Sequence, residues 1–110
     1  MSEMDLEESS GNVFADLGFS PGEAEELTAK STLILAMKGV MTDRALTQKQ
    51  AAKVCGTDQP TLSKVLHGRM DSVTLDRLAH WLTALGQDVE ITVRPAPATR
   101  QARLHVAAAA

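Results

Sequence analysis

The sequence contains very few aromatic residues and a single cysteine. Of its 110 residues, two are Phe, one is Trp and none is Tyr. The core must therefore be built from aliphatic side chains. Because Cys55 is alone, an intrachain disulfide and a cysteine-based zinc site are both excluded. Its place on the inner face of a predicted helix favours a role as a small buried hydrophobe.

Long hydrophobic runs are also missing, as is the basic segment followed by an apolar stretch that marks a signal peptide. We therefore expect a cytoplasmic protein, and the length suits one domain with a modest core. His67, His80 and His105 are scattered, and neither a Ser/His/Asp arrangement nor a phosphate-cradling glycine loop is present. The sequence thus predicts no enzyme, no metal site and no cofactor.

Charge is distributed unevenly along the chain. The net charge is −3, yet residues 1–26 carry eight acidic side chains and no Lys or Arg. The remaining residues carry 11 basic and 6 acidic side chains. This pattern indicates an acidic arm attached to a basic domain. The arm either keeps the protein soluble or binds a basic partner protein.

The stretch 47–68 has the pattern of two short helices joined by a tight turn. Ala52 offers a small residue where two crossing helices touch, and Gly56 can take a positive φ at the end of the first helix. Leu62 and Val65 can then pack the second helix back onto the first. This joint spacing is typical of a helix-turn-helix, although an αα-hairpin with a solvated second helix is the plain alternative.

The second helix of this pair has a well-marked start. Asp58 is a suitable N-cap, and Pro60 falls in the first turn, where a missing N–H costs nothing. Five residues here lack a core role and suit a helix that enters the DNA major groove: Gln59, Pro60, Thr61, Ser63 and Lys64.

Further basic and polar residues flank this unit. Thr47 and Gln50 form a Thr-x-x-Gln capping box, which places Gln48 and Lys49 beside free backbone N–H groups, a ready phosphate site. Arg69 follows the second helix and is either a further phosphate contact or simply exposed.

Two more helices are expected around this unit. Ser20 caps a long helix from Pro21 to about Asp43, with Glu23 completing a capping box. Thr74 caps another, which ends at Gly86. The apolar stripes of these helices are carried by Leu27, Ile34, Met37 and Met41 in the first and by Leu75, Leu78, Ala79, Leu82 and Leu85 in the second.

Residues 88–94 alternate strictly between polar and apolar side chains, which predicts a strand. No second strand is visible, so the backbone groups need a partner outside this chain. We expect Val89, Ile91 and Val93 to lie in a two-stranded ribbon across a homodimer. A rival solution is that the strand extends the sheet of another protein.

Both Phe residues lie in the acidic arm. Val13, Phe14, Leu17 and Phe19 either pack on their own domain or anchor a partner protein. Asn12 can cap a single helical turn that ends at Gly18. We divide the chain into a partly disordered acidic arm (1–20), a helix-turn-helix DNA-binding domain with a C-terminal dimerisation strand (21–95) and a flexible tail (96–110).

Four segments carry a resemblance to a known family: residues 12–19, 46–52, 59–64 and 85–95. Through them the chain from Gly11 to Pro95 resembles XRE-type (Cro/repressor-like) helix-turn-helix proteins and, more closely, their HigA-type antitoxin branch. The fold this implies is mainly α, a repressor-like bundle of about five helices with one C-terminal β-strand that pairs across a dimer.

The resemblance also implies a function. Proteins of that branch are dimeric, bind operator DNA, neutralise a basic RelE/HigB-like toxin and repress their own operon; a stand-alone repressor without a toxin is the alternative. The positions that correspond to base contacts are Gln59, Pro60, Ser63 and Lys64, and those for phosphate contacts are Gln48, Lys49 and Thr61. Pro60 departs from the commoner polar residue and can offer only an apolar contact to a thymine methyl group.

Overall fold

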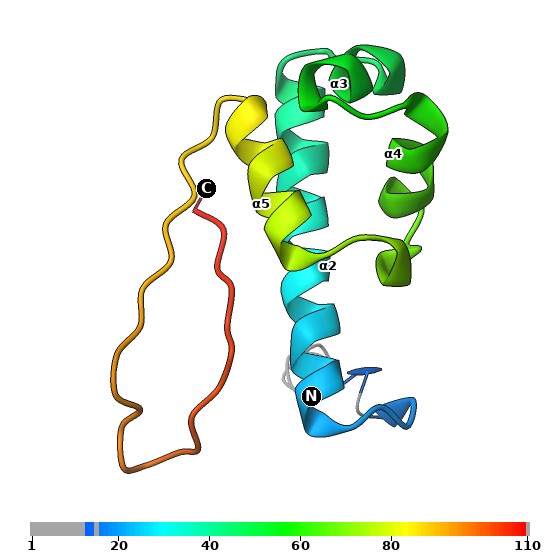
Figure 1. Ribbon diagram of the computed structural model, residues 1–110. Helices are drawn as coiled ribbons and strands as arrows, with labels where there is room; N and C mark the ends of the chain where they lie inside the picture. Colours follow the sequence, from blue (N-terminus) through cyan, green and yellow to red (C-terminus); the bar gives the residue numbers. More distant parts are fainter. Residues whose placement is uncertain (1–12, 15, 110) are drawn as a thin grey trace, which may run out of the picture.

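The computed structural model describes residues 13–14 and 16–109. In this part of the chain the element order is α2 (Pro21–Asp43), α3 (Gln48–Cys55), α4 (Gln59–Leu66), the 3-10 helix η1 (Met70–Ser72) and α5 (Leu75–Ala84). Helix α2 runs the length of the molecule, α5 lies against it, and α3 and α4 pack together beside its C-terminal half (Figure 1). The mainly helical fold is confirmed, with four α-helices among the described residues where about five helices were expected.

The starts of the helices follow the predicted capping residues. At α2, Glu23 N–H donates to Ser20 Oγ over 3.2 Å and Ser20 N–H donates to Glu23 Oε1 over 3.0 Å. At α3, the corresponding bonds between Thr47 and Gln50 are 3.1 and 2.8 Å long. Thr74 accepts from Arg77 N–H at the start of α5. These side chains satisfy N–H groups that the first turn of a helix leaves free, so the predicted boundaries are confirmed.

The end of α2 holds a feature that the sequence did not indicate. Ala45 has a φ of 54°, in the left-handed region that favours glycine. Its N–H donates to Thr42 O over 3.1 Å, and Leu46 N–H donates to Met41 O over 2.8 Å. These two bonds form a Schellman motif, which closes the helix and directs the chain into α3.

The core lies between α2, α5 and the α3–α4 pair, and it is aliphatic as expected. Its largest fully buried side chains are Met37, Leu62, Val65, Leu78 and Leu85. Trp81 is also buried, whereas Leu46 and Cys55 are partly buried against the cluster. Partial burial raises the pKa of the Cys55 thiol above its ordinary value. Together the buried side chains of this cluster hold α4 against α3 and α2.

The strand predicted at 88–94 is not formed in the single chain. Residues 87–97 have no regular secondary structure, and the chain after α5 leaves the helices as a long loop that doubles back (Figure 1). The physical reason is that a strand needs a neighbouring strand to accept and donate its hydrogen bonds, and the described residues supply none. Val89 is half-buried against the core, but Ile91 and Val93 are 84% and 92% exposed.

Among the described residues, no helix combines the length and the apolar composition that a membrane span needs.

Candidate nucleic-acid interface

The turn between α3 and α4 is built as the sequence predicts. Gly56 has a φ of 75°; its N–H donates to Lys53 O, and Thr57 N–H donates to Ala52 O over 2.9 Å. Ala52 itself is buried at the contact between the two helices. The turn is therefore a Schellman motif whose left-handed residue is a glycine, and it reverses the chain in two residues.

Helix α4 has one buried and one exposed face. Leu62, Val65 and Leu66 point into the core. On the other side Gln59, Pro60 and Lys64 are exposed, and Thr61 and Ser63 are half-buried. All five residues that were predicted to approach DNA therefore keep some or all of their surface open to solvent.

The first turn of α4 is fixed by Asp58. Its Oδ1 accepts from Thr61 N–H over 2.8 Å, and the hydrogen bonds from Thr61 hold the pKa of Asp58 below its ordinary value. Asp58 is thus ionised at neutral pH and serves the cap. Its negative charge stands beside the residues offered to DNA, which is tolerable because the helix N-terminus is itself positive.

A side-chain hydrogen bond joins the starts of α3 and α4. Gln59 Nε2 donates to Gln48 Oε1 over 3.0 Å. This bond uses one N–H of Gln59 and leaves its second N–H and its Oε1 free. The two free groups are the ones that an amide side chain offers to the N7 and N6 of adenine. The sequence indicated both glutamines separately, but not that one supports the other.

Basic residues lie on both sides of this pair. Lys49 is exposed in the first turn of α3, and Lys64 is exposed in the last turn of α4. Arg69 is exposed in the loop that follows, where Gly68 has a φ of 96° and Arg69 N–H donates to Lys64 O over 3.0 Å. The basic groups thus come from the two helices and the loop behind them.

Two residues that sequence reasoning left out lie next to this surface. Lys38 of α2 and His67 border a shallow groove of about 360 Å³ that Gln48 also lines. His67 Nδ1 lies 2.7 Å from Ser63 O and 3.3 Å from Ser63 Oγ, so the hydroxyl of Ser63 has a partner in the residue that caps the end of α4. In the sequence, Lys38 lies off the apolar stripe of α2. That position was the only indication that its side chain faces outward.

The four apolar residues of the acidic arm lie outside the core. Val13, Leu17 and Phe19 are 44%, 69% and 41% exposed, and Phe14 is half-buried. The Phe14 and Phe19 rings meet edge to face, with centroids 6.2 Å apart. Leu17 N–H donates to Val13 O, which gives the expected single helical turn, and the predicted cap Asn12 falls outside the described residues.

Comparison with known proteins agrees with this geometry. Residues 13–94 match the model of a helix-turn-helix domain family. A solved structure named as an XRE-family transcriptional regulator is 38% identical to this chain; the match covers 79% of this chain and 99% of that one, with a TM-score of 0.73. No curated protein matches the chain at a significant level.

A helix-turn-helix supported by a long first helix and closed by a final helix defines a class of DNA-binding proteins. The chain belongs to the helix-turn-helix domain family, and within it to the XRE type. The described residues contain no group of three or more His, Cys, Asp or Glu side chains placed to hold a metal ion.

Proposed function

We propose that the chain is a transcriptional repressor that reads its operator with α4. The observation that carries this proposal is the Gln48–Gln59 hydrogen bond at the exposed start of α4. A side chain held in place before it meets DNA loses less conformational freedom on binding. Gln59 can therefore offer its free N–H and Oε1 together to one adenine, while Lys64 and Ser63 reach neighbouring bases and Pro60 contacts a thymine methyl group.

Phosphate contacts would fix the register of α4 in the groove. Lys49 and the free Nε2 of Gln48 lie at the start of α3, next to N–H groups that attract anions. Arg69, in the loop after α4, would make a second phosphate contact. The hydroxyl of Thr61, at the start of α4, would make a third. These contacts carry no sequence information, but they set affinity and its dependence on salt.

We also propose a homodimer built through residues 88–94. Val89 anchors the beginning of this segment on the core, and the β-branched residues Ile91 and Val93 are almost fully exposed. Two antiparallel copies would satisfy their backbone groups and cover these side chains. A dimer would present two α4 helices to half-sites about 34–36 Å apart.

The proposed partner beyond DNA is a basic toxin of the RelE/HigB-like kind, which would make the protein an antitoxin. The support is the acidic arm (1–20), where Val13, Leu17 and Phe19 are exposed apolar groups in a segment without any basic residue. Exposed apolar anchors with negative charge around them suit a basic protein surface.

A stand-alone repressor is the second candidate. The similar solved structure, which is named as a transcriptional regulator and which this chain covers almost completely, supports this candidate as much as it supports the first. The two candidates make the same claim about α4 and differ only in the arm.

Selection of duplexes from a random-sequence library tests the shared claim. We expect enrichment of a two-fold-symmetric site with half-sites one helical turn apart, because the proposed dimer presents two identical α4 helices to DNA. If the protein enriches no sequence and binds all duplexes equally, α4 does not read bases and the proposed function is wrong.

A further inference from the structure

Lys30 is the one charged residue that is buried among the described residues. It is 7% exposed and lies on the face of α2 that meets η1. Its Nζ is 3.0 Å from Met70 O and 3.5 Å from Glu26 Oε2, and the Glu26 side chain is itself 53% exposed. An apolar side chain would fill this position without the cost of removing an ammonium group from water. The position of the charge therefore needs a reason other than packing.

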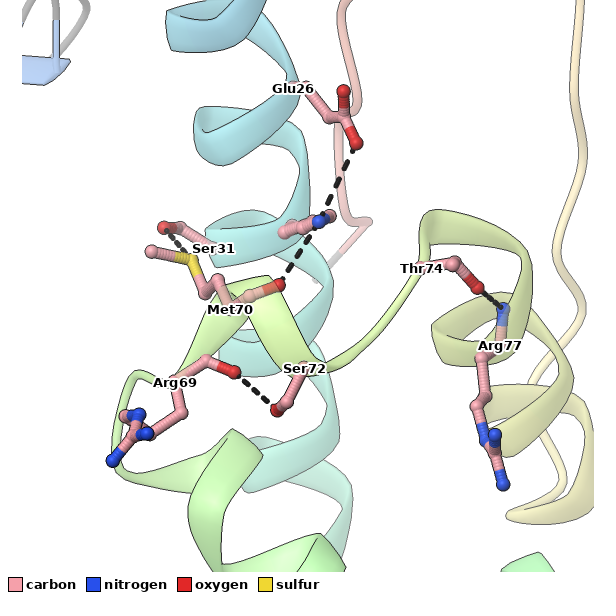
Figure 2. A network of polar contacts seen from close by, with 8 residues as sticks. Glu26, Ser31, Arg69, Met70, Ser72, Thr74 and Arg77 are labelled. Atoms are coloured by element: carbon pink, nitrogen blue, oxygen red, sulfur yellow. Dashed lines mark hydrogen bonds and ion pairs between the residues drawn. The ribbon is translucent and has the colours of Figure 1, made fainter. Parts of the chain in front are cut away.

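The reason lies in what Lys30 holds. Met70 is the first residue of η1, directly after the exposed Arg69. Helix α2 holds Met70 at two points: Lys30 Nζ donates to its carbonyl oxygen, and Ser31 Oγ lies 3.3 Å from its sulfur. Figure 2 shows this network from close by, with Ser31 and Glu26 on the long helix and Met70 against it.

The main chain of Arg69 is held on both sides as well. Its N–H donates to Lys64 O in the last turn of α4. Its carbonyl oxygen accepts from Ser72 Oγ over 2.6 Å. The Arg69 side chain takes no part in these bonds and points away from Met70 and Ser72 (Figure 2). The loop is thus fixed at its backbone and offers one free guanidinium.

We propose that Lys30 is a positioning residue for DNA binding, which acts through Arg69. The inference rests on the proposed function. By fixing Met70 O to α2, Lys30 keeps the Arg69 loop at a set distance from α4, so that the guanidinium meets a phosphate when α4 enters the groove. Without this bond the loop would stay tied to α4 through Arg69 N–H, but the phosphate contact would lose part of the ordering that makes it favourable.

The salt dependence of DNA binding tests this inference. One phosphate contact contributes about 0.9 to the slope of log Kobs against log salt concentration. We expect Arg69→Ala to lower the slope by about one unit in the wild-type background. Lys30→Met should cause the same loss, and adding Arg69→Ala to Lys30→Met should lower the slope no further. Lys30→Arg keeps a donor and should retain the slope.

Glu26→Gln is the matched control on the same helix. It removes the ion pair with Lys30 but leaves the bond to Met70 O, so its slope should equal that of the wild type. Circular dichroism establishes that each variant is folded. If Lys30→Met does not fold, Lys30→Gln, which is shorter and neutral, replaces it with the same expectation.

Two results would overturn the inference while DNA binding stands. One is a Lys30→Met protein that is less stable to heat but keeps the wild-type slope, which would show a purely structural role. The other is a further full unit lost on adding Arg69→Ala to Lys30→Met, which would show that the two residues act independently. A wild-type protein without measurable DNA binding would instead overturn the proposed function itself, and the inference with it.

Discussion

Gln59 Nε2 lies 3.0 Å from Gln48 Oε1, so the first side chains of α3 and α4 form one hydrogen-bonded unit. The bond crosses the turn of the helix-turn-helix and leaves free the Nε2 group of Gln48 and the Oε1 and second N–H of Gln59. A residue predicted to contact phosphate thus supports a residue predicted to contact a base. We therefore expect specificity and affinity to be coupled at this point.

Replacing Gln59 by Ala should remove base reading selectively. We expect a loss of about 1–3 kcal/mol on the preferred site and little change on random DNA, because the two amide contacts to adenine are lost. Fluorescence anisotropy with both duplexes measures the difference. Equal losses on the two duplexes would show that Gln59 does not read sequence.

Lys49→Ala should behave in the opposite way. The side chain is exposed at the start of α3, where we propose that it neutralises a phosphate. Affinity for all duplexes should fall alike, and the salt slope should become shallower by about one unit. Lys53→Ala, an exposed lysine in the last turn of the same helix, is the control and should change the slope less.

Ala45→Gly should stabilise the protein. Ala45 has a φ of 54°, and a residue with a Cβ atom pays roughly 1–2 kcal/mol in the left-handed region. Glycine removes this strain but adds freedom to the unfolded chain, so we expect a net gain of about 0.5–1 kcal/mol. Urea unfolding measures the free energy of unfolding.

Gly56→Ala is the counterpart of that change. Its φ is 75°, and no atom lies within 4 Å of an added Cβ, so any loss comes from the backbone alone. We expect a destabilisation of about 1 kcal/mol. If Gly56→Ala stabilised the protein and Ala45→Gly destabilised it, the left-handed residues in these two motifs would carry no strain, and only the freedom of glycine in the unfolded chain would count.

Local signals explain why much of the helical frame was predictable. Two capping boxes, at Ser20 and Thr47, and the left-handed Gly56 each involve residues only a few positions apart. Neighbouring residues in the sequence are therefore enough to predict them. The same holds for the apolar stripe of α2. Each of these boundaries depends on hydrogen bonds between residues close in sequence.

Contacts between distant residues were not predictable in this way. Lys30 and Met70 are 40 positions apart. The spacing of apolar residues along α2 does not show whether a lysine on this helix binds a carbonyl oxygen or lies in water. The Gln48–Gln59 bond depends on the crossing of α3 and α4. The strand at 88–94 is not formed in the single chain for a related reason, because alternation predicts a strand only where a partner strand exists.

Ile91→Pro tests whether that partner is a second copy. Ile91 is 84% exposed, so the change should leave the helices intact, while it removes one backbone donor from a ribbon. We expect a monomer with wild-type helical content and weaker binding to the two-fold-symmetric site. Sedimentation measures the mass. A variant that stays dimeric would place the interface elsewhere.

The acidic arm should be needed for toxin binding but not for DNA binding. Its negative charge repels phosphate, so it cannot strengthen contact with DNA, whereas a ribonuclease toxin is basic because it binds RNA. Deleting residues 1–19 keeps the Ser20 cap of α2 and should spare operator affinity. It should abolish neutralisation of a basic toxin encoded beside this gene.

Phe14→Ala and Leu17→Ala should each reproduce much of that loss, since aromatic and apolar anchors carry most of the energy of an interface. Leu17 is 69% exposed, so its removal should not change the melting temperature. Leu35→Ala is the control, because Leu35 is 66% exposed but lies on α2, outside the arm.

A deletion that lowers the melting temperature strongly while toxin binding persists would show that Phe14 and Phe19 only cover the start of α2. Normal repression without any toxin partner would favour the stand-alone repressor.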